Sequence, residues 1–228
     1  MRDSDFRPPS FLDATTPVGV RSGRDLPHWS QAGTVAFITW RTWDSMPQSV
    51  VAGWVARRNG WLETHGIDPR DPDLSAVIRG LTAAQREEFR ELLSERWECA
   101  LDASHGSCPF RSPELASVVG DSLLHFDGER YTMHDFVVMP NHVHLLVSFA
   151  ADEGMTDQCE SWKHFTAVRL NRLLKRTGRF WHAESFDHLV RSAEWFEKYR
   201  RYIADNPVKA QLRPGEYLHY SRPTAGPT

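Results

Sequence analysis

The chain of 228 residues has few cysteines and no long apolar run. Cys99, Cys108 and Cys159 are an odd number with no closely spaced pair, which argues against a disulfide framework and a cysteine zinc site. No stretch reaches the ~20 apolar residues of a membrane span, and the N-terminus lacks the apolar core of a secretory signal. We therefore expect no membrane association and a reducing, cytoplasmic setting.

Acidic residues are missing from one segment, since none stands between Ser161 and Ala183. The basic residues of this segment are Lys163, Arg169, Arg172, Lys175, Arg176 and Arg179. Although the net charge of the whole chain is −3, a local basic segment indicates a surface for a polyanion such as DNA. A solvated helix face would explain the same charges, so charge alone leaves both interpretations open.

Two histidines stand one residue apart in the segment "PNHVHLLVS", which begins at Pro140. In a strand, residues two apart lie on the same face, so His142, His144 and Leu146 should point one way. Val143, Leu145 and Val147 should then face the core. The two imidazoles would be ~6.6–7 Å apart at the backbone and could share one metal ion. Half-buried histidines without a metal are the commoner explanation of such a pair.

The order of the expected elements is strand, helices, strand, strand, helix, helix. Strands are predicted over 33–43, 130–139 and 142–148, with a turn at Asp127–Gly128 and an antiparallel return at Pro140–Asn141. Helices are predicted near 45–66, from Thr82 onwards, from Ser112–Pro113, over 160–176 and from Ser192. This order favours an α+β fold with helices on one face of an antiparallel sheet.

The last predicted helix carries an aromatic stripe made by Trp195, Tyr199 and Tyr202, and Asn206 continues it. Tyr202 and Asn206 are four residues apart and share a helix face. We expect the helix to end at Asn206 because Pro207 follows. An aromatic stripe at this spacing is usually part of a core.

Taken together, "VVMPNHVHLLVS" and the later "RYIADNPVKAQL" resemble the single-tyrosine HUH transposases of bacterial insertion sequences, and most of all their REP-associated tyrosine transposase branch. The segments "LPHWSQAGTVAFITWRTWDSMP", "SWKHFTAVRLNRLL" and "GRFWHAESFDHLVR" add to the resemblance, which covers roughly residues 26–212.

The resemblance implies a ferredoxin-like HUH endonuclease core with a helical insertion at about 59–106. It also implies a transposase that cleaves and rejoins single-stranded hairpin DNA. His142 and His144 match the histidines that hold a divalent metal, Mg²⁺ or Mn²⁺, and Asn206 matches a third ligand. Tyr202 matches the nucleophile that becomes joined to a 5′-phosphate, and Tyr199 is the second choice.

The domain limits that follow are a flexible arm over 1–25, the transposase domain over 26–213 and a loose tail over 214–228. The basic residues listed above would bind DNA phosphates, and Trp162, Phe165, Phe180 and Trp181 are candidates for stacking on bases. Monomer and homodimer both stay open.

Two alternatives remain. One is a domesticated hairpin-DNA-binding protein without mobility. The other is an unrelated metallohydrolase, which would need further histidine or carboxylate ligands, with Asp135 as the nearest carboxylate.

Overall fold

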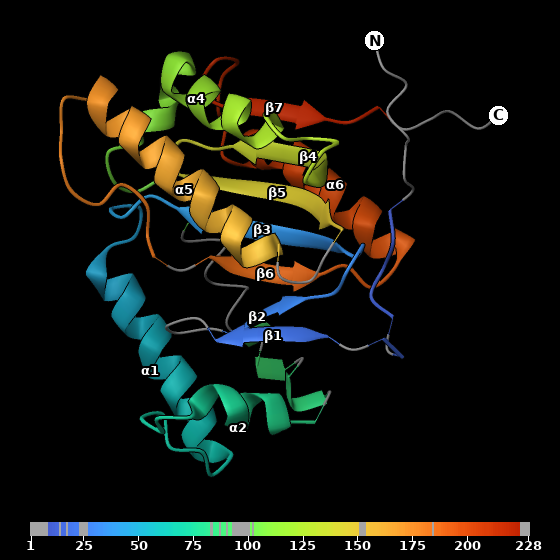
Figure 1. Ribbon diagram of the computed structural model, residues 1–228. Coiled ribbons are helices and arrows are strands. Elements are labelled where there is room, and N and C mark those ends of the chain that lie inside the picture. The colour runs from blue at the N-terminus through green and yellow to red at the C-terminus, as the bar shows by residue number, and fades with distance from the viewer. Residues whose placement is uncertain are drawn as a thin grey trace.

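The computed structural model describes residues 9–13, 15–16, 18–22, 27–82, 84–86, 88–89, 91–92, 101, 103–150, 154–183 and 185–223. Figure 1 shows a sheet flanked by helices, with a helical extension below it. The elements are β1 (Gly19–Ser22), β2 (Pro27–Ser30), β3 (Val35–Arg41), α1 (Gln48–Thr64), α2 (Leu74–Gly80), η1 (Pro109–Arg111), α4 (Pro113–Leu124), β4 (Tyr131–Val138), β5 (His142–Phe149), α5 (Gly154–Leu173), β6 (Phe186–Leu189), α6 (Ala193–Lys209) and β7 (Leu218–Ser221).

The main sheet is antiparallel throughout, in the order β6-β3-β5-β4-β7. Helix α4 connects β3 to β4, and α5 connects β5 to β6. Two successive strand–helix–strand units with their strands in the order β6-β3-β5-β4 form the ferredoxin-like arrangement. Strand β7 extends the sheet at its β4 edge. The predicted α+β class, with helices on an antiparallel sheet, is confirmed.

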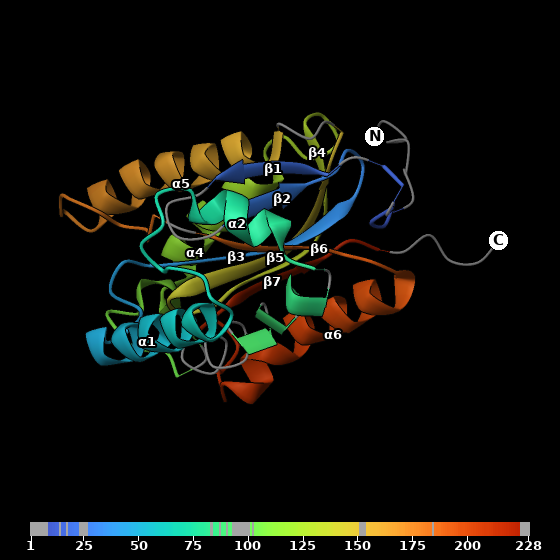
Figure 2. The ribbon, with the colours of Figure 1, turned by 90° about the horizontal axis from the view of Figure 1, so that it is seen from below.

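Helices cover both faces of this sheet, whereas helices on one face were predicted. Helices α4 and α5 pack over one face around a core that includes Trp40, Val143 and Trp162. Helix α6 packs over the other face around Phe37, Leu146 and other apolar side chains. Figure 2 shows α5 and α6 on opposite sides of the sheet. The expectation failed because the aromatic stripe of α6 needs an apolar surface of its own.

A helical arm, comprising α1, α2 and the helical turns at 84–86, 88–89 and 91–92, leaves the sheet after β3. Its first helix begins at Gln48, within the helix predicted near 45–66. The arm has its own apolar cluster, which includes Trp61, Leu62 and Phe89. Thr82 caps its last part as predicted, because the Gln85 amide donates to Thr82 Oγ1 and the Thr82 amide donates back to Gln85 Oε1.

Strand structure also occurs in segments that were expected to be loose. Strand β1 lies inside the predicted N-terminal arm and pairs with β2, and β7 lies inside the predicted tail and pairs with β4. Leu12 donates its amide to the Val190 carbonyl, so this part of the arm is held against the sheet. Both strands have four residues, which is too short for an alternating pattern to stand out.

Helix α6 continues through Pro207 to Lys209, so the predicted end at Asn206 is wrong. A proline removes only the hydrogen bond of its own nitrogen, and the Ala210 amide still reaches the Asn206 carbonyl at 3.0 Å. Among the described residues, no helix is long and apolar enough to cross a membrane. Cys108 and Cys159 are free thiols, whereas Cys99 lies outside the described residues.

Candidate active site

The two histidines of β5 lie side by side under α6, with their rings turned toward each other. Both residues are 0% exposed, and His142 Nε2 is 3.0 Å from His144 Nε2. Two ligands at right angles on an octahedral cation about 2.1 Å away would also stand about 3.0 Å apart. The spacing of the imidazole nitrogens is therefore that of two neighbouring ligands of one metal ion.

Asn141 fixes the proton on the His142 ring. Its side-chain Nδ2 donates to the His105 carbonyl at 2.7 Å, which turns Oδ1 toward His142 Nδ1, also at 2.7 Å. An amide oxygen can only accept, so Nδ1 of His142 carries the proton and donates it. The lone pair of His142 therefore lies on Nε2, where it faces the second histidine.

Thr39 holds the His144 ring from the neighbouring strand. Its hydroxyl Oγ1 is 2.7 Å from His144 Nδ1, because Thr39 and His144 are directly paired across β3 and β5. A hydroxyl can donate or accept, so His144 Nε2 can carry a proton toward His142 or present a lone pair to a metal. Partners of this kind orient imidazole ligands and set their basicity.

Both rings are neutral near pH 7. Burial lowers the pKa of His142 to about 3. Burial, together with repulsion from His142, lowers the pKa of His144 well below its ordinary value. Neutral imidazole is the form that binds metal ions.

Asn206 brings an unsatisfied amide to the same face of the sheet. It is 0% exposed, and neither its Nδ2 nor its Oδ1 has a hydrogen-bond partner among the described residues. A buried amide in this state costs free energy, so such groups are rare in proteins. A metal ion beside the histidines would satisfy the amide oxygen, and the donor set of His142, His144 and Asn206 therefore fits a divalent cation.

No other ligand set competes with this one in the part of the chain that the structure describes, where no three His, Cys, Asp or Glu side chains gather to hold a metal. The alternative of an unrelated metallohydrolase required such ligands. Its candidate Asp135 instead binds Arg200 and Ser221.

Tyr202 stands one helical turn before Asn206, against the histidines. Its ring centroid is 5.2 Å from that of His144, edge to face, and the Lys209 Nζ lies 5.4 Å from the Tyr202 ring centroid. Tyr199 is stacked on Phe37, with 4.4 Å between ring centroids. Tyr202 is therefore in edge-to-face contact with a histidine of the pair.

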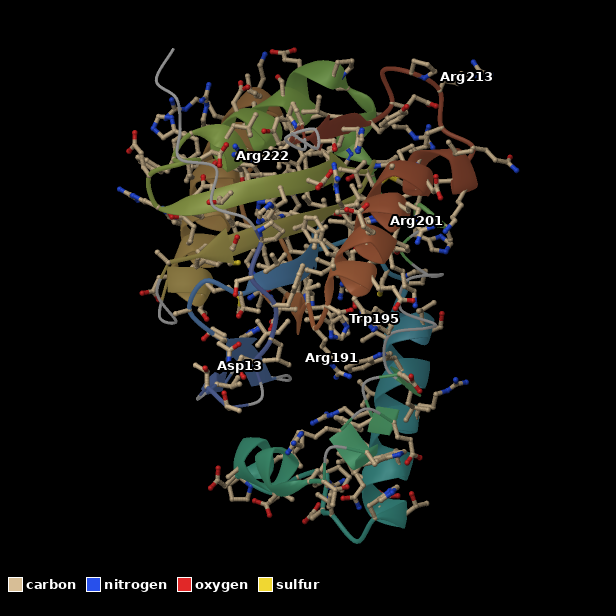
Figure 3. All side chains as sticks on the ribbon, turned by 90° about the vertical axis from the view of Figure 1, so that its right-hand side faces the viewer. Asp13, Arg191, Trp195, Arg201, Arg213 and Arg222 are labelled. Atoms are coloured by element: carbon tan, nitrogen blue, oxygen red, sulfur yellow. The ribbon has the colours of Figure 1, made fainter. Side chains whose placement is uncertain are left out.

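An ion pair fixes α6 on the sheet. Arg200 Nε donates to Asp135 Oδ2 at 2.9 Å, and Arg200 Nη2 donates to Ser221 Oγ at 2.8 Å. The Asp135 side chain is 3% exposed, so the pair is shielded from water. Figure 3 views α6 from the side, with Trp195 near its start and Arg201 further along. The anchor holds the Tyr202 turn over β5.

The predicted DNA-binding residues do not gather around this site. Lys163, Arg169 and Arg172 belong to α5, on the opposite face of the sheet. Lys175 and Arg176 follow α5 and are exposed. Arg179 contacts Trp43, just beyond β3, with its guanidinium carbon 4.5 Å from the ring centroid.

Three of the four aromatic residues suggested for base stacking are core residues, with Trp162 and Phe180 2% exposed and Trp181 5% exposed. Sequence reasoning missed Asn141, Thr39 and Trp43. Asn141 directly precedes the first histidine, which was a usable signal. Thr39 is found only through the strand register.

The fold and the site together define an α+β protein with a buried histidine–amide cluster beside a helix-borne tyrosine. No family model and no curated protein matches the chain. A solved structure, described as a REP-associated tyrosine transposase bound to a REP hairpin, is similar with a TM-score of 0.39 and 12% sequence identity. The match covers 80% of this chain and 71% of that one.

Proposed function

We propose that the chain is a metal-dependent DNA strand transferase that cleaves and rejoins single-stranded DNA carrying a hairpin. Tyr202 is the nucleophile, and His142, His144 and Asn206 hold a Mg²⁺ or Mn²⁺ ion. The observation that carries the proposal is the convergence of the histidine pair, the unsatisfied amide and the tyrosine on one face of the sheet.

The ligand types suit a cation of intermediate character. Imidazole nitrogen is a ligand for transition metals, and amide oxygen suits Mg²⁺ and Mn²⁺. When bound, such a cation neutralises charge on the non-bridging phosphate oxygens and orients the phosphate. Asn141 and Thr39 keep both ring orientations fixed for this purpose.

The proposed reaction uses the tyrosine as its nucleophile. The Tyr202 oxygen attacks phosphorus, and the bond from phosphorus to the 3′ oxygen breaks. The phenol loses its proton and the 3′ oxygen gains one, leaving a free 3′-hydroxyl and a 5′-phosphotyrosine. Attack by another 3′-hydroxyl reverses the step and joins strands without nucleotide hydrolysis. The Lys209 ammonium group is placed to favour the developing negative charge.

Entry of DNA requires a local opening. Because His142 and His144 are 0% exposed, a phosphate reaches them only after the residues that cover them have moved. Turnover therefore includes a conformational step.

The proposal is tested with Mn²⁺ and labelled single-stranded hairpin DNA, with products separated on denaturing gels. We expect a covalent protein–DNA adduct in the wild type. Tyr202→Phe should abolish it by removing the nucleophile, and His142→Ala should abolish it by removing a ligand. Tyr199→Phe is the matched control and should retain it, because the Tyr199 ring is stacked on Phe37.

Each result has a distinct meaning. An adduct that persists in Tyr202→Phe but not in Tyr199→Phe would move the nucleophile to Tyr199. Tight hairpin binding without an adduct under any condition would contradict the proposed chemistry and favour the domesticated binder.

A further inference from the structure

Trp43 presents a large aromatic surface to solvent just beyond β3. It is 50% exposed, whereas Trp40, three residues earlier, is 2% exposed. Exposing that much indole is unfavourable, because apolar area in water costs free energy. Isolated exposed aromatic residues are common, so the surroundings of the ring decide what it is for.

The backbone under this ring is held firmly. The Trp43 amide donates to the Phe180 carbonyl at 2.9 Å, and the Thr42 amide donates to the Asn141 carbonyl at 2.8 Å. Thr42 also forms a β-bridge with Trp181. The ring therefore projects from a fixed point between the main sheet and the segment that follows α5, so binding a ligand would order little additional backbone.

Two polar groups lie against the ring. His182 stacks on it with 5.8 Å between centroids and 15° between planes. The Arg179 guanidinium carbon is 4.5 Å from the indole centroid. A half-exposed indole with a cation over its ring is suited to a flat ligand joined to an anion, and an unpaired nucleobase with its phosphate has this composition.

The backbone that carries the ring also lies near the candidate active site. Arg41, two residues before Trp43, is paired across the sheet with His142. Thr42 contacts Asn141, the residue next to His142. Two residues of extended chain span about 7 Å, so a strand that reaches the histidines would pass close to this ring. In Figure 1, the chain leaves β3 toward α1 at the same end of the sheet where the segment after α5 returns.

We propose that Trp43, with Arg179 and His182 against its ring, is a stacking site for an unpaired base of single-stranded DNA. The inference rests on the proposed function and adds to it the place where the strand is held beside the histidines. Because any base can stack on an aromatic ring, the site binds the strand without selecting for its sequence.

Two probes distinguish binding to the bases from binding to the phosphates. One is a fluorescein-labelled twelve-nucleotide oligo(dT), and the other is a strand of equal length built from abasic units, which keeps the phosphates and lacks the bases. Affinities are measured by fluorescence anisotropy at low salt, without added metal. We expect Trp43→Ala to weaken oligo(dT) binding about tenfold and to leave the abasic strand unchanged.

Trp195→Ala is the matched control. Trp195 is 37% exposed and has the Lys198 Nζ 4.0 Å from its ring centroid, but it lies on the first turns of α6. It should leave both affinities unchanged. Trp43→Phe keeps an aromatic plane and should retain most of the preference for oligo(dT). Arg179→Ala should weaken both probes, because it removes a charge.

A direct contact is read separately by ultraviolet crosslinking of oligo(dT) that carries one 5-iododeoxyuridine, with mass spectrometry of the peptides. Crosslinking at Trp43 supports the inference. Equal affinity of the wild type for both probes, or an equal loss in Trp43→Ala, would overturn it.

Neither measurement depends on strand cleavage. If no Tyr202 adduct forms but the preference for bases still depends on Trp43, the proposed chemistry is contradicted and the stacking site is supported.

Discussion

Replacing Asn206 with leucine should stabilise the metal-free protein. The Asn206 amide is 0% exposed, and both of its polar atoms lack partners among the described residues. An unsatisfied buried polar group costs about 1–3 kcal/mol, and an apolar side chain of similar size carries no such cost. Asn206→Leu should therefore add about 2 kcal/mol to the free energy of unfolding, which corresponds to a rise of about 5 °C in Tm for a chain of this length.

Asn141→Leu is the matched control and should act in the opposite direction. Asn141 is also 0% exposed, but its amide is bonded to the His105 carbonyl and to His142 Nδ1. Leucine there removes both bonds and leaves the buried His142 nitrogen without its acceptor. We expect a loss of about 2 kcal/mol.

The assay is thermal unfolding in a chelator and again in excess Mn²⁺. A ligand at a hundredfold its Kd stabilises the folded protein by about 2.7 kcal/mol, so the wild type should gain several degrees with Mn²⁺. Asn206→Leu should lose most of this gain while it keeps the higher Tm in chelator. A fall in its metal-free Tm, similar to that of Asn141→Leu, would refute the reasoning.

Three further outcomes are expected. Thr39→Val removes the hydroxyl beside His144 Nδ1 and should weaken Mn²⁺ binding about tenfold or more, as measured by calorimetry. An unchanged affinity would show that the hydroxyl does not orient the ring. Arg200→Met leaves the buried Asp135 carboxylate without its cation and should cost about 3 kcal/mol in urea unfolding near pH 7, whereas a cost below about 1 kcal/mol would mean that the pair does not anchor α6. Burial, with nearby positive charge, lowers the pKa of His134 from 6.5 to about 4, so the unfolded chain takes up this proton first as the pH falls. Stability should therefore drop by about 3 kcal/mol between pH 6.5 and 4, and His134→Gln should flatten that part of the profile; an unchanged slope would contradict the assignment.

Local periodicity was enough to predict the main strands and helices and the shared face of the histidine pair. The strand period of two placed His142 beside His144, and the helix period put Tyr202 on the face of Asn206. Both relations depend only on neighbours in the chain.

The remaining features depend on residues far apart in the chain. The bond from Asn141 to the His105 carbonyl exists because the helical arm returns to the start of β5. The contact of Thr39 with His144 depends on the register of two strands separated by the arm, α4 and β4. The basic residues of α5 were predicted to bind DNA phosphates from charge alone, and charge does not tell on which face of the sheet the helix lies.

All the groups of the candidate active site come from one polypeptide. Helix α6 packs on the sheet of its own chain, through the apolar cluster around Phe37 and the anchor from Arg200 to Asp135. Under the proposed function, with the groups held as they are in this chain, we expect a mixture of Tyr202→Phe and His142→Ala copies to form no adduct. We also expect the specific activity to stay constant on dilution, and a fall on dilution would indicate that a second copy completes the site.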